Sequence, residues 1–198
     1  QIKEFKPQYA TINSDEHKQK LQSIFPELEI VKNIEELTSI PDTDIVLSAI
    51  VGIAGLEANI AALKSAKRVA VANKETLVSA PHLVRQASKD HGSELIPVDS
   101  EHVAIHQCLA SHPQTSVKEI LLTASGGPFL KLAIEEFENI KLDQALKHPK
   151  WKMGPKITID SSTLINKGLE VIEVNSLFDI DYYRIRVVIH PQSIVHSA

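Results

Sequence analysis

Short apolar runs rich in β-branched residues alternate with stretches of helical spacing through the first half of the chain. The apolar runs predict strands at residues 9–12, 44–51, 68–72 and 94–98. The stretches between and after them predict helices at residues 15–25, 33–40, 55–66, 75–90 and 102–110. Ser14 is the expected N-cap of the first helix, Pro26 and Pro41 are expected to end helices, and Pro81 either lies in the first turns of its helix or breaks it. This alternation indicates a mostly parallel sheet covered by helices.

The second half of the chain is less regular. Strands are predicted at residues 119–124, 156–160 and 184–189, and helices at 134–139, 142–146 and 162–178, around a loop at 148–155. The pattern changes near Val98. We therefore expect an α/β protein in which residues 1–98 form a parallel sheet with helices and residues 99–198 form an α+β unit.

Composition narrows the class of protein. The 198 residues are 43% hydrophobic and 23% charged, which is typical of a soluble globular chain of one or two domains. A net charge of −4 argues against a surface that generally coats nucleic acid, and no apolar run approaches the ~20 residues of a membrane span. The single cysteine excludes an internal disulfide. The chain starts without Met and shows no signal-peptide core, so we expect a processed chain or an excerpt.

Two carboxylates follow the strand predicted at residues 94–98. Asp99 and Glu101 stand two positions apart, so in an extended segment both side chains would point the same way. The carboxyl ends of parallel strands are where α/β proteins bind ligands, and paired carboxylates suit Mg²⁺ or Mn²⁺. The alternative is structural: Asp99 or Ser100 caps the helix that starts near His102, and the helix dipole favours Glu101.

A second polar group lies at the start of the last predicted helix. Asn166 and Glu170 are i, i+4 neighbours, so Glu170 is a candidate third metal carboxylate. Ser161, Asn166 and Lys167 offer hydrogen-bond donors that suit a phosphate. Gly168 costs the helix about 1 kcal/mol relative to Ala, and the close approach of a ligand or a neighbouring helix would explain it. The alternative is a capped helix with an ordinary polar face.

Two loops and a pair of histidines complete the candidate chemistry. Ser125-Gly126-Gly127-Pro128 follows a predicted strand, and its glycines let backbone amides approach an anion, although a plain turn needs the same residues. The loop at residues 148–156 is rich in lysine and holds the chain's only Trp and only Met. These residues suit a hinged lid, an exposed basic loop or a nucleic-acid contact, although the acidic chain argues against the last. His102 and His106 are interpreted as surface or supporting residues. The chain contains neither G-x-G-x-x-G nor G-x-S-x-G.

Six motifs in one order connect these groups to a family. Ala72-Asn73-Lys74-Glu75 and residues 97–102, 125–129, 148–154, 160–170 and 189–197 resemble the 1-deoxy-D-xylulose 5-phosphate reductoisomerases. The resemblance covers nearly all of the chain and is weakest before about Pro41. It implies an NADPH- and metal-dependent oxidoreductase of the non-mevalonate route to isoprenoids. Such an enzyme rearranges a ketose phosphate to a branched aldehyde and reduces it to 2-C-methyl-D-erythritol 4-phosphate.

The resemblance also implies a role for each matching residue. Mg²⁺ or Mn²⁺ would be held by Asp99, Glu101 and Glu170. Catalytic groups would be Lys74, His148, Lys167 and Glu101. Substrate-binding residues would be Lys74, Ser100, Glu101, Ser125, His148, Ser161, Asn166, Lys167 and Glu170. NADPH would be contacted by Asn73, Glu75 and Gly154, and the lid would be formed by Trp151 and Met153.

The same resemblance sets the expected organisation. Residues 1–98 would be part of an NADPH-binding Rossmann-like domain, and residues 99–198 a catalytic domain incomplete at its C-terminus. The family's Gly-rich first turn and helical C-terminal domain have no counterpart in this sequence, so the alternative is a non-catalytic fragment that binds metal and sugar phosphate. The family implies a homodimer, a sugar-phosphate substrate, no nucleic-acid or membrane partner, and a location in the bacterial cytoplasm or the stroma of a plastid-type organelle.

Overall fold

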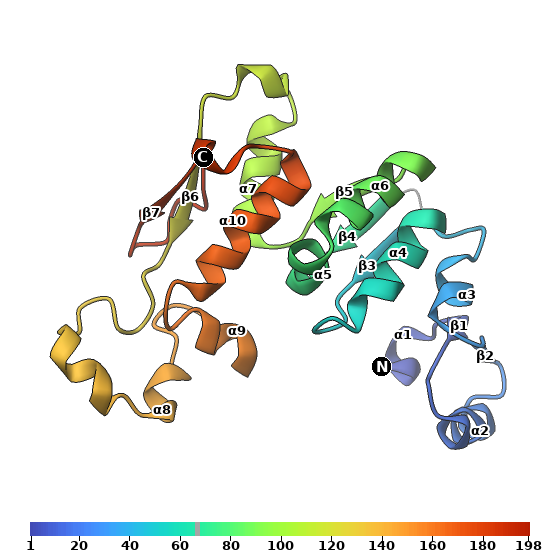
Figure 1. Ribbon diagram of the computed structural model, residues 1–198. Coiled ribbons are helices and arrows are strands. Elements are labelled where there is room, and N and C mark those ends of the chain that lie inside the picture. The colour runs from blue at the N-terminus through green and yellow to red at the C-terminus, as the bar shows by residue number, and fades with distance from the viewer. Residues whose placement is uncertain (66–67) are drawn as a thin grey trace. The chain divides into compact units, whose positions relative to one another are not determined.

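Parallel strand pairs organise the computed structural model, which describes residues 1–65 and 68–198 (Figure 1). The paired strands are β1 (Tyr9–Ala10) with β2 (Glu29–Ile30), β3 (Ile45–Ser48) with β4 (Arg68–Val71), and β6 (Ile120–Ala124) with β7 (Ile185–Ile189). A further strand, β5 (Glu94–Pro97), lies beside β4. The chain divides into two units, Gln1–Ile96 and Pro97–Ala198. The predicted mixed α/β class with parallel sheets is confirmed.

The helices of the first unit follow the predicted ones, except that the short helix at residues 2–5 was not predicted and the helix predicted at 75–90 is divided. They are α1 (Ile2–Phe5), α2 (Asp15–Ile24), α3 (Ile34–Thr38), α4 (Gly55–Ser65), α5 (Lys74–Ser79) and α6 (Pro81–His91). The expected N-cap of α2 is confirmed, because the Ser14 hydroxyl accepts the His17 amide at 3.4 Å. The helix predicted at 75–90 is broken in two, and Pro81 opens the second part at a position where no amide hydrogen is needed. Ala66, the last residue predicted for the α4 helix, lies outside the described residues.

A small core connects the helices of the first unit to its central sheet. Leu63 on α4, Val69 on β4 and Leu77 on α5 are fully or almost fully buried. The buried Asn59 side chain donates to the Gly55 carbonyl and to the Thr76 hydroxyl, both at 2.9 Å, so it joins α4 to α5. This core holds the start of α5 next to the carboxyl end of β4, where ligands bind in parallel sheets.

The second unit packs two helices against the β6–β7 pair. Its elements are α7 (Ser100–Leu109), the 3₁₀ turns η1 (Gln114–Ser116), η2 (Ile134–Asn139) and η3 (Tyr182–Arg184), and the helices α8 (Leu142–Ala145), α9 (Pro155–Asp160) and α10 (Ile165–Phe178). The buried cluster between these layers consists of Ile105, Ile120, Leu122, Val174 and Ile180. The longest described helix, α10, has 14 residues, and none in the described chain has the length and apolar character needed to cross a membrane.

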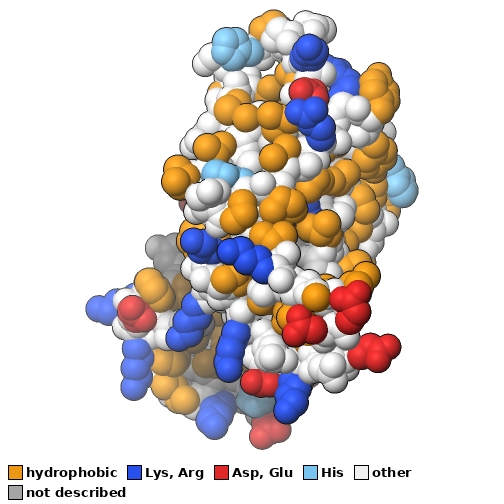
Figure 2. All heavy atoms as spheres, turned by 90° about the vertical axis from the view of Figure 1, so that its left-hand side faces the viewer, with side chains coloured by type: hydrophobic (Ala, Val, Ile, Leu, Met, Phe, Trp, Pro, Cys, Tyr) orange, Lys and Arg blue, Asp and Glu red, His pale blue; other side chains and the backbone are white. Residues whose placement is uncertain are grey.

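The chain turns back after β7 and runs along β6. Leu121 and Ala198 exchange two backbone hydrogen bonds of 2.7 and 3.0 Å. Figure 2 views the second unit from the side of β7 and shows hydrophobic side chains gathered across this face. Val187, Val188 and Ile189 of β7 are among the exposed apolar residues.

The strand predicted at residues 156–160 is wrong, because this segment is the helix α9. Pro155 occupies the first helical position, where its fixed φ favours a helix and its missing amide hydrogen costs nothing. The Thr158 hydroxyl donates to the Gly154 carbonyl at 2.8 Å. This hydrogen bond to the preceding turn accommodates in a helix a β-branched side chain that would otherwise favour a strand. The following helix also starts later than predicted, at Ile165, because the turn after α9 takes the intervening residues.

Candidate functional site

One cavity of the second unit collects the polar residues singled out in the sequence. Its volume is about 380 Å³. It lies at the start of α7, the carboxyl end of β6, the loop before α9 and the start of α10. The predicted site residues on its wall are Asp99, Ser100, Glu101, Ser125, His148, Trp151, Met153, Ser161, Asn166, Lys167 and Glu170. Gly154 is the N-cap of α9, and Asn73, Lys74 and Glu75 belong to the first unit.

Three carboxylates converge in this cavity. Asp99, Glu101 and Glu170 each offer an oxygen, and these atoms all lie within 4.8 Å of one another. Glu170 is 2% exposed, so it faces its partners from inside the protein. Oxygen ligands of this kind suit a hard divalent cation such as Mg²⁺ or Mn²⁺.

The convergence of Asp99 and Glu101 has a different origin from the one expected. The segment is not extended beyond Asp99, because Ser100 already starts α7. Asp99 occupies the N-cap position, but its side chain makes no capping hydrogen bond. The change from the extended Asp99 to the first turn of α7, rather than strand alternation, therefore brings the two carboxylates together.

Lys167 and Asn166 connect the carboxylates to one another. The Lys167 ammonium donates to Glu101 Oε1 at 3.3 Å and to Glu170 Oε2. The Asn166 amide donates to Glu170 Oε1 from one turn earlier on α10. Asn166 Oδ1 is buried and has no hydrogen-bond partner among the described residues. This oxygen could accept a hydroxyl hydrogen of a ligand in the cavity.

His148 holds the loop before α9 against the end of β6. Its Nδ1 accepts the backbone amides of Lys150 at 3.3 Å and Trp151 at 3.0 Å, so this nitrogen carries no hydrogen. Its Nε2 lies 3.2 Å from the Ser125 hydroxyl, which also accepts the Gly127 amide at 3.3 Å. Burial lowers the pKa of His148 below its ordinary value of 6.5. The neutral ring therefore presents an Nε2–H to Ser125, and the Ser125 hydrogen is directed elsewhere.

The glycines near the cavity differ in whether the structure requires a residue without a Cβ atom. Gly126 and Gly127 have φ of +88° and +72°, a region that favours glycine. A Cβ on Gly127 would collide with the Ser161 carbonyl oxygen, so this glycine permits the loop after β6 to approach the α9–α10 turn. A Cβ on Gly168 would meet nothing within 4 Å in the described chain. The expected approach of a neighbouring helix to Gly168 is therefore wrong, and the approach of a ligand stays a prediction.

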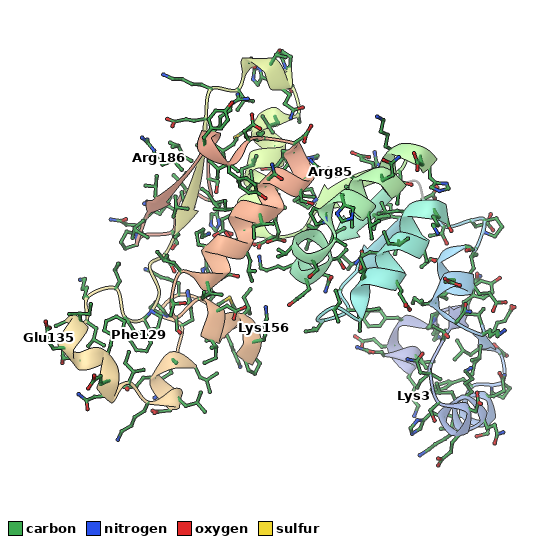
Figure 3. All side chains as sticks on the ribbon, viewed as in Figure 1. Lys3, Arg85, Phe129, Glu135, Lys156 and Arg186 are labelled. Carbon is green, nitrogen blue, oxygen red and sulfur yellow. The ribbon has the colours of Figure 1, made fainter. Side chains whose placement is uncertain are left out.

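Most residues of the segment between β6 and α9 are exposed. Figure 3 shows Phe129 where this segment leaves β6 and Glu135 near its outer end. The rings of Phe129 and Phe137 lie 6.3 Å apart at a tilt of 58°. Trp151 is 49% exposed, and its ring lies 6.1 Å from that of His196. A mostly exposed segment that places an aromatic side chain on the cavity wall has the physical character of a lid.

The residues after β7 line the cavity and received no role from the sequence. They are His190, Ser193, Val195 and His196. His190 Nε2 accepts the amides of Ile194 at 3.1 Å and Val195 at 3.2 Å, which shapes the turn. The feature of the sequence that could have identified them is the polar stretch at residues 190–193, directly after the strand predicted at 184–189. Because Ala124 pairs with Ile189 in register, the ends of β6 and β7 meet at one edge and their loops share the cavity.

The predicted residues of the first unit lie together at the start of α5. Asn73 is 3% exposed, and its Oδ1 accepts the Thr76 amide at 2.9 Å as the N-cap. Its Nδ2 donates to the Gly52 carbonyl at 3.0 Å and to Glu75 Oε2 at 3.1 Å. Lys74 and Glu75 follow on the first turn, half-buried. The Asn73 side chain thus braces the turn after β3 against α5.

Comparison with known proteins decides the family. Residues 1–81 match the family model described as 1-deoxy-D-xylulose 5-phosphate reductoisomerase, and residues 95–178 match the model of that enzyme's C-terminal domain. The chain belongs to the 1-deoxy-D-xylulose 5-phosphate reductoisomerase family. The resemblance inferred from its motifs is confirmed.

Curated members of the reductoisomerase family are similar over the whole chain. The 1-deoxy-D-xylulose 5-phosphate reductoisomerase of Agathobacter rectalis is 48% identical over 203 residues, which cover 100% of this chain and 53% of the relative. That of Chlorobium chlorochromatii is 50% identical over 202 residues, with coverage of 100% and 53%. The chain spans about half the length of the curated relatives it matches.

Solved reductoisomerase structures have the same fold. A DOX-P reductoisomerase in complex with NADPH, fosmidomycin and magnesium matches with a TM-score of 0.90 at 42% identity, over 99% of this chain and 52% of that one. The enzyme from Zymomonas mobilis in complex with NADPH matches with a TM-score of 0.89 at 38% identity, over 99% and 51%. These identities are high enough that the likeness extends beyond the fold to the family.

Proposed function

We propose that this chain carries the metal and sugar-phosphate centre of an NADPH-dependent reductoisomerase. The enzyme converts 1-deoxy-D-xylulose 5-phosphate to 2-C-methyl-D-erythritol 4-phosphate by a skeletal rearrangement followed by hydride reduction. The observation that supports this most strongly is the convergence of Asp99, Glu101 and Glu170 within 4.8 Å in a cavity that also holds Ser125, Asn166 and Lys167. A divalent-cation site beside phosphate donors is what the reaction requires.

The metal site of the proposal fits the donor set. Asp99, Glu101 and Glu170 hold Mg²⁺ or Mn²⁺ through carboxylate oxygens, and the cation supplies Lewis-acid stabilisation of charge on the substrate oxygens. The solved relative with NADPH, fosmidomycin and magnesium supports the same pair of cofactors. The burial of Glu170 keeps one ligand in place, while the partly exposed Asp99 and Glu101 face the incoming substrate.

The remaining cavity residues bind and orient the substrate. Ser125, Ser161, Asn166 and Lys167 hold the phosphate, and Ser100 contacts the hydroxyl groups. The family resemblance assigns a further substrate-binding role to Lys74 of the first unit. His148 presents its Nε2–H from the loop, because its Nδ1 is already committed to the amides of Lys150 and Trp151. Lys167 holds a proton beside Glu101 and Glu170, as an ammonium that stabilises negative charge in the cavity.

The cofactor side of the proposal rests on the first unit. Residues 1–98 form part of an NADPH-binding Rossmann-like domain, and residues 99–198 belong to the catalytic domain. We assign NADPH contacts to Glu75 and to Asn73, whose side chain acts through the turn that it braces. The family resemblance assigns a further contact to Gly154. Trp151 and Met153 close over the substrate and exclude water. We include a homodimer, and a cytoplasmic or plastid-type location, as further parts of the proposal.

The test is NADPH consumption that depends on both the ketose phosphate and Mg²⁺ or Mn²⁺. Full-length protein is expected to show it, and Glu170→Gln is expected to lower the rate at least a hundredfold because a buried ligand is lost. Glu16→Gln, an exposed carboxylate on α2, serves as the matched control and should keep the rate. A folded wild type that binds Mn²⁺ and sugar phosphate but consumes no NADPH would support the non-catalytic alternative instead.

A further inference from the structure

A buried histidine lies next to the carboxylates of the cavity. His102, on the first turn of α7, is 0% exposed, and its Nε2 lies 3.1 Å from the Glu170 carbonyl oxygen. A carbonyl oxygen only accepts hydrogen bonds, so Nε2 carries the hydrogen and donates it. The other ring nitrogen, Nδ1, is buried and has no hydrogen-bond partner among the described residues. Buried polar atoms are seldom left in this condition.

The unpartnered Nδ1 is directed toward carboxylate oxygens. Asp99 Oδ2 lies 3.8 Å away, which is longer than a hydrogen bond. Glu173, which is 3% exposed on α10, brings a further carboxylate to the same point. One ligand atom from each of Asp99, His102 and Glu173 lies within 4.8 Å of the other two. A nitrogen lone pair and carboxylate oxygens repel one another, and a cation between them removes this repulsion.

We propose that Asp99, His102 and Glu173 form a second divalent-cation site, which shares Asp99 with the carboxylate site. The bond from Nε2–H to a backbone carbonyl is the outer contact that metal-bound histidines usually make, and it directs Nδ1 to the ion. Two metal–ligand bonds of about 2.1 Å each bridge roughly 3–4 Å between ligand atoms. One ion would therefore span the 3.8 Å between His102 and Asp99.

The ligand set indicates which ions this site binds. An imidazole nitrogen with two carboxylates favours Mn²⁺, Co²⁺ or Zn²⁺, whereas Mg²⁺ prefers oxygen ligands alone. The carboxylate site of Asp99, Glu101 and Glu170 takes either class. A chain with both sites therefore binds two ions when only Mn²⁺ is supplied and one ion when only Mg²⁺ is supplied. Asp99 is the ligand that the two sites share. This second site goes beyond the proposed function and does not depend on it.

The experiment uses full-length protein and Mn²⁺ as the probe. Calorimetric titration counts the bound ions, and pulsed electron paramagnetic resonance detects a nitrogen ligand through its coupling to Mn²⁺. Wild type is expected to bind two Mn²⁺ and to show imidazole coupling. Glu173→Gln and His102→Gln are expected to weaken the second ion at least tenfold and to remove the coupling. His148→Gln, which changes another histidine of the cavity, should still bind two Mn²⁺ and show the imidazole coupling.

Glu101→Gln separates this proposal from the proposed function. It removes a ligand of the carboxylate site alone, so the nitrogen-coupled ion should remain while metal-dependent NADPH consumption falls. Wild type with two equivalents of Mn²⁺ and no nitrogen coupling would overturn the second site, even if the variants failed to fold. A folded Glu173→Gln protein that keeps two Mn²⁺ and the coupling would also overturn it.

Discussion

At the scale of single residues, Lys167 places a positive charge among the carboxylates of the cavity. Its ammonium is almost fully buried and bonds to Glu101 and Glu170, two of the three carboxylates that a metal ion would need. A buried cation beside carboxylates stabilises their charged form, but it also occupies the oxygens that would bind Mg²⁺. Lys167 and the metal therefore compete for the same ligand atoms.

This competition predicts that Lys167→Met tightens metal binding. Met preserves the apolar stem and removes the competing charge, so we expect Mn²⁺ to bind roughly fivefold tighter, which corresponds to about 1 kcal/mol. Calorimetric titration of the folded variant measures the change. Lys152→Met, which removes a lysine of the cavity wall that is exposed, is the matched control and should have a smaller effect. Unchanged or weaker Mn²⁺ binding by Lys167→Met would show that no competition exists.

His148 is the residue through which pH acts on the lid. Its pKa is lowered by burial from 6.5, and its Nδ1 can accept the Lys150 and Trp151 amides only when it is unprotonated. When the loop opens, the His148 ring is solvated and its pKa returns toward 6.5. At a pH between the lowered pKa and 6.5, the ring therefore binds more protons in the open loop than in the closed loop. The closed loop is thus fully stabilised above pH 6.5 and loses this stability as the pH falls through the lowered pKa.

The resulting prediction is a fluorescence change of Trp151, the only tryptophan of the chain, as the pH falls below 6.5. The change should be absent in His148→Gln, whose side chain does not titrate. Because the His196 ring lies 6.1 Å from Trp151 and a protonated imidazole quenches indole, the titration is repeated in His196→Gln. The same pH-dependent step in His148→Gln would assign the transition to another group.

At the scale of elements, the site depends on how closely the loop after β6 approaches the turn between α9 and α10. Gly127 makes that approach possible, with φ of +72° and the Ser161 carbonyl where a Cβ would be. Gly168 has no such role in the described chain, because the space beside it within α10 is open. Two glycines of one site are therefore expected to respond in opposite directions to the same substitution.

We predict that Gly127→Ala destabilises the second unit by about 2 kcal/mol or more, because strain and a backbone collision add together. Gly168→Ala is predicted to stabilise it by about 0.5–1 kcal/mol, because Ala loses less backbone entropy than Gly in a helix. Urea unfolding followed by Trp151 fluorescence measures both free energies of unfolding. A stable Gly127→Ala protein would contradict the close approach. A Gly168→Ala protein that is stabilised but binds sugar phosphate more weakly would locate a ligand beside Gly168.

At the scale of the whole molecule, the metal ligands are confined to one of the two units. Asp99, Glu101 and Glu170 all belong to Pro97–Ala198, whereas Asn73, Lys74 and Glu75 belong to Gln1–Ile96. A ligand that binds the folded state protects the cooperative unit that contains its site. Metal binding and cofactor binding should therefore protect different parts of the chain.

Hydrogen exchange of the full-length protein tests this division. Mn²⁺ alone is predicted to slow exchange of the amides at the starts of α7 and α10 and to leave Gln1–Ile96 unchanged. NADPH is predicted to protect the start of α5. Glu101→Gln supplies the control, because it removes a metal ligand and should abolish the Mn²⁺ effect on both helices. Equal protection of both units by Mn²⁺ would mean that the cation acts on the molecule as one body.

Local rules of the sequence determined most of the elements and the chemical types of the site residues. Ser14 as a cap, Pro81 as a break and the alternation of strands with helices each depend on residues close in the chain, so they can be predicted without a partner element. The exception is α9, where a run of β-branched residues favoured a strand. Pro155 at the first helical position and the hydrogen bond of the Thr158 hydroxyl stabilise a helix instead. The six motifs likewise indicated the family before any geometry was known.

The tertiary structure alone decided which of these residues meet. The pairing of β6 with β7 brings the loop at His190 to the cavity, and the packing of α7 beside α10 places His102 against the Glu170 carbonyl and near Glu173. These contacts join residues more than 60 positions apart. No local pattern encodes them, because they depend on the strand register and on the burial of one shared core. The sequence alone thus predicts the carboxylates of the site, while the long-range packing selects the histidine that joins them.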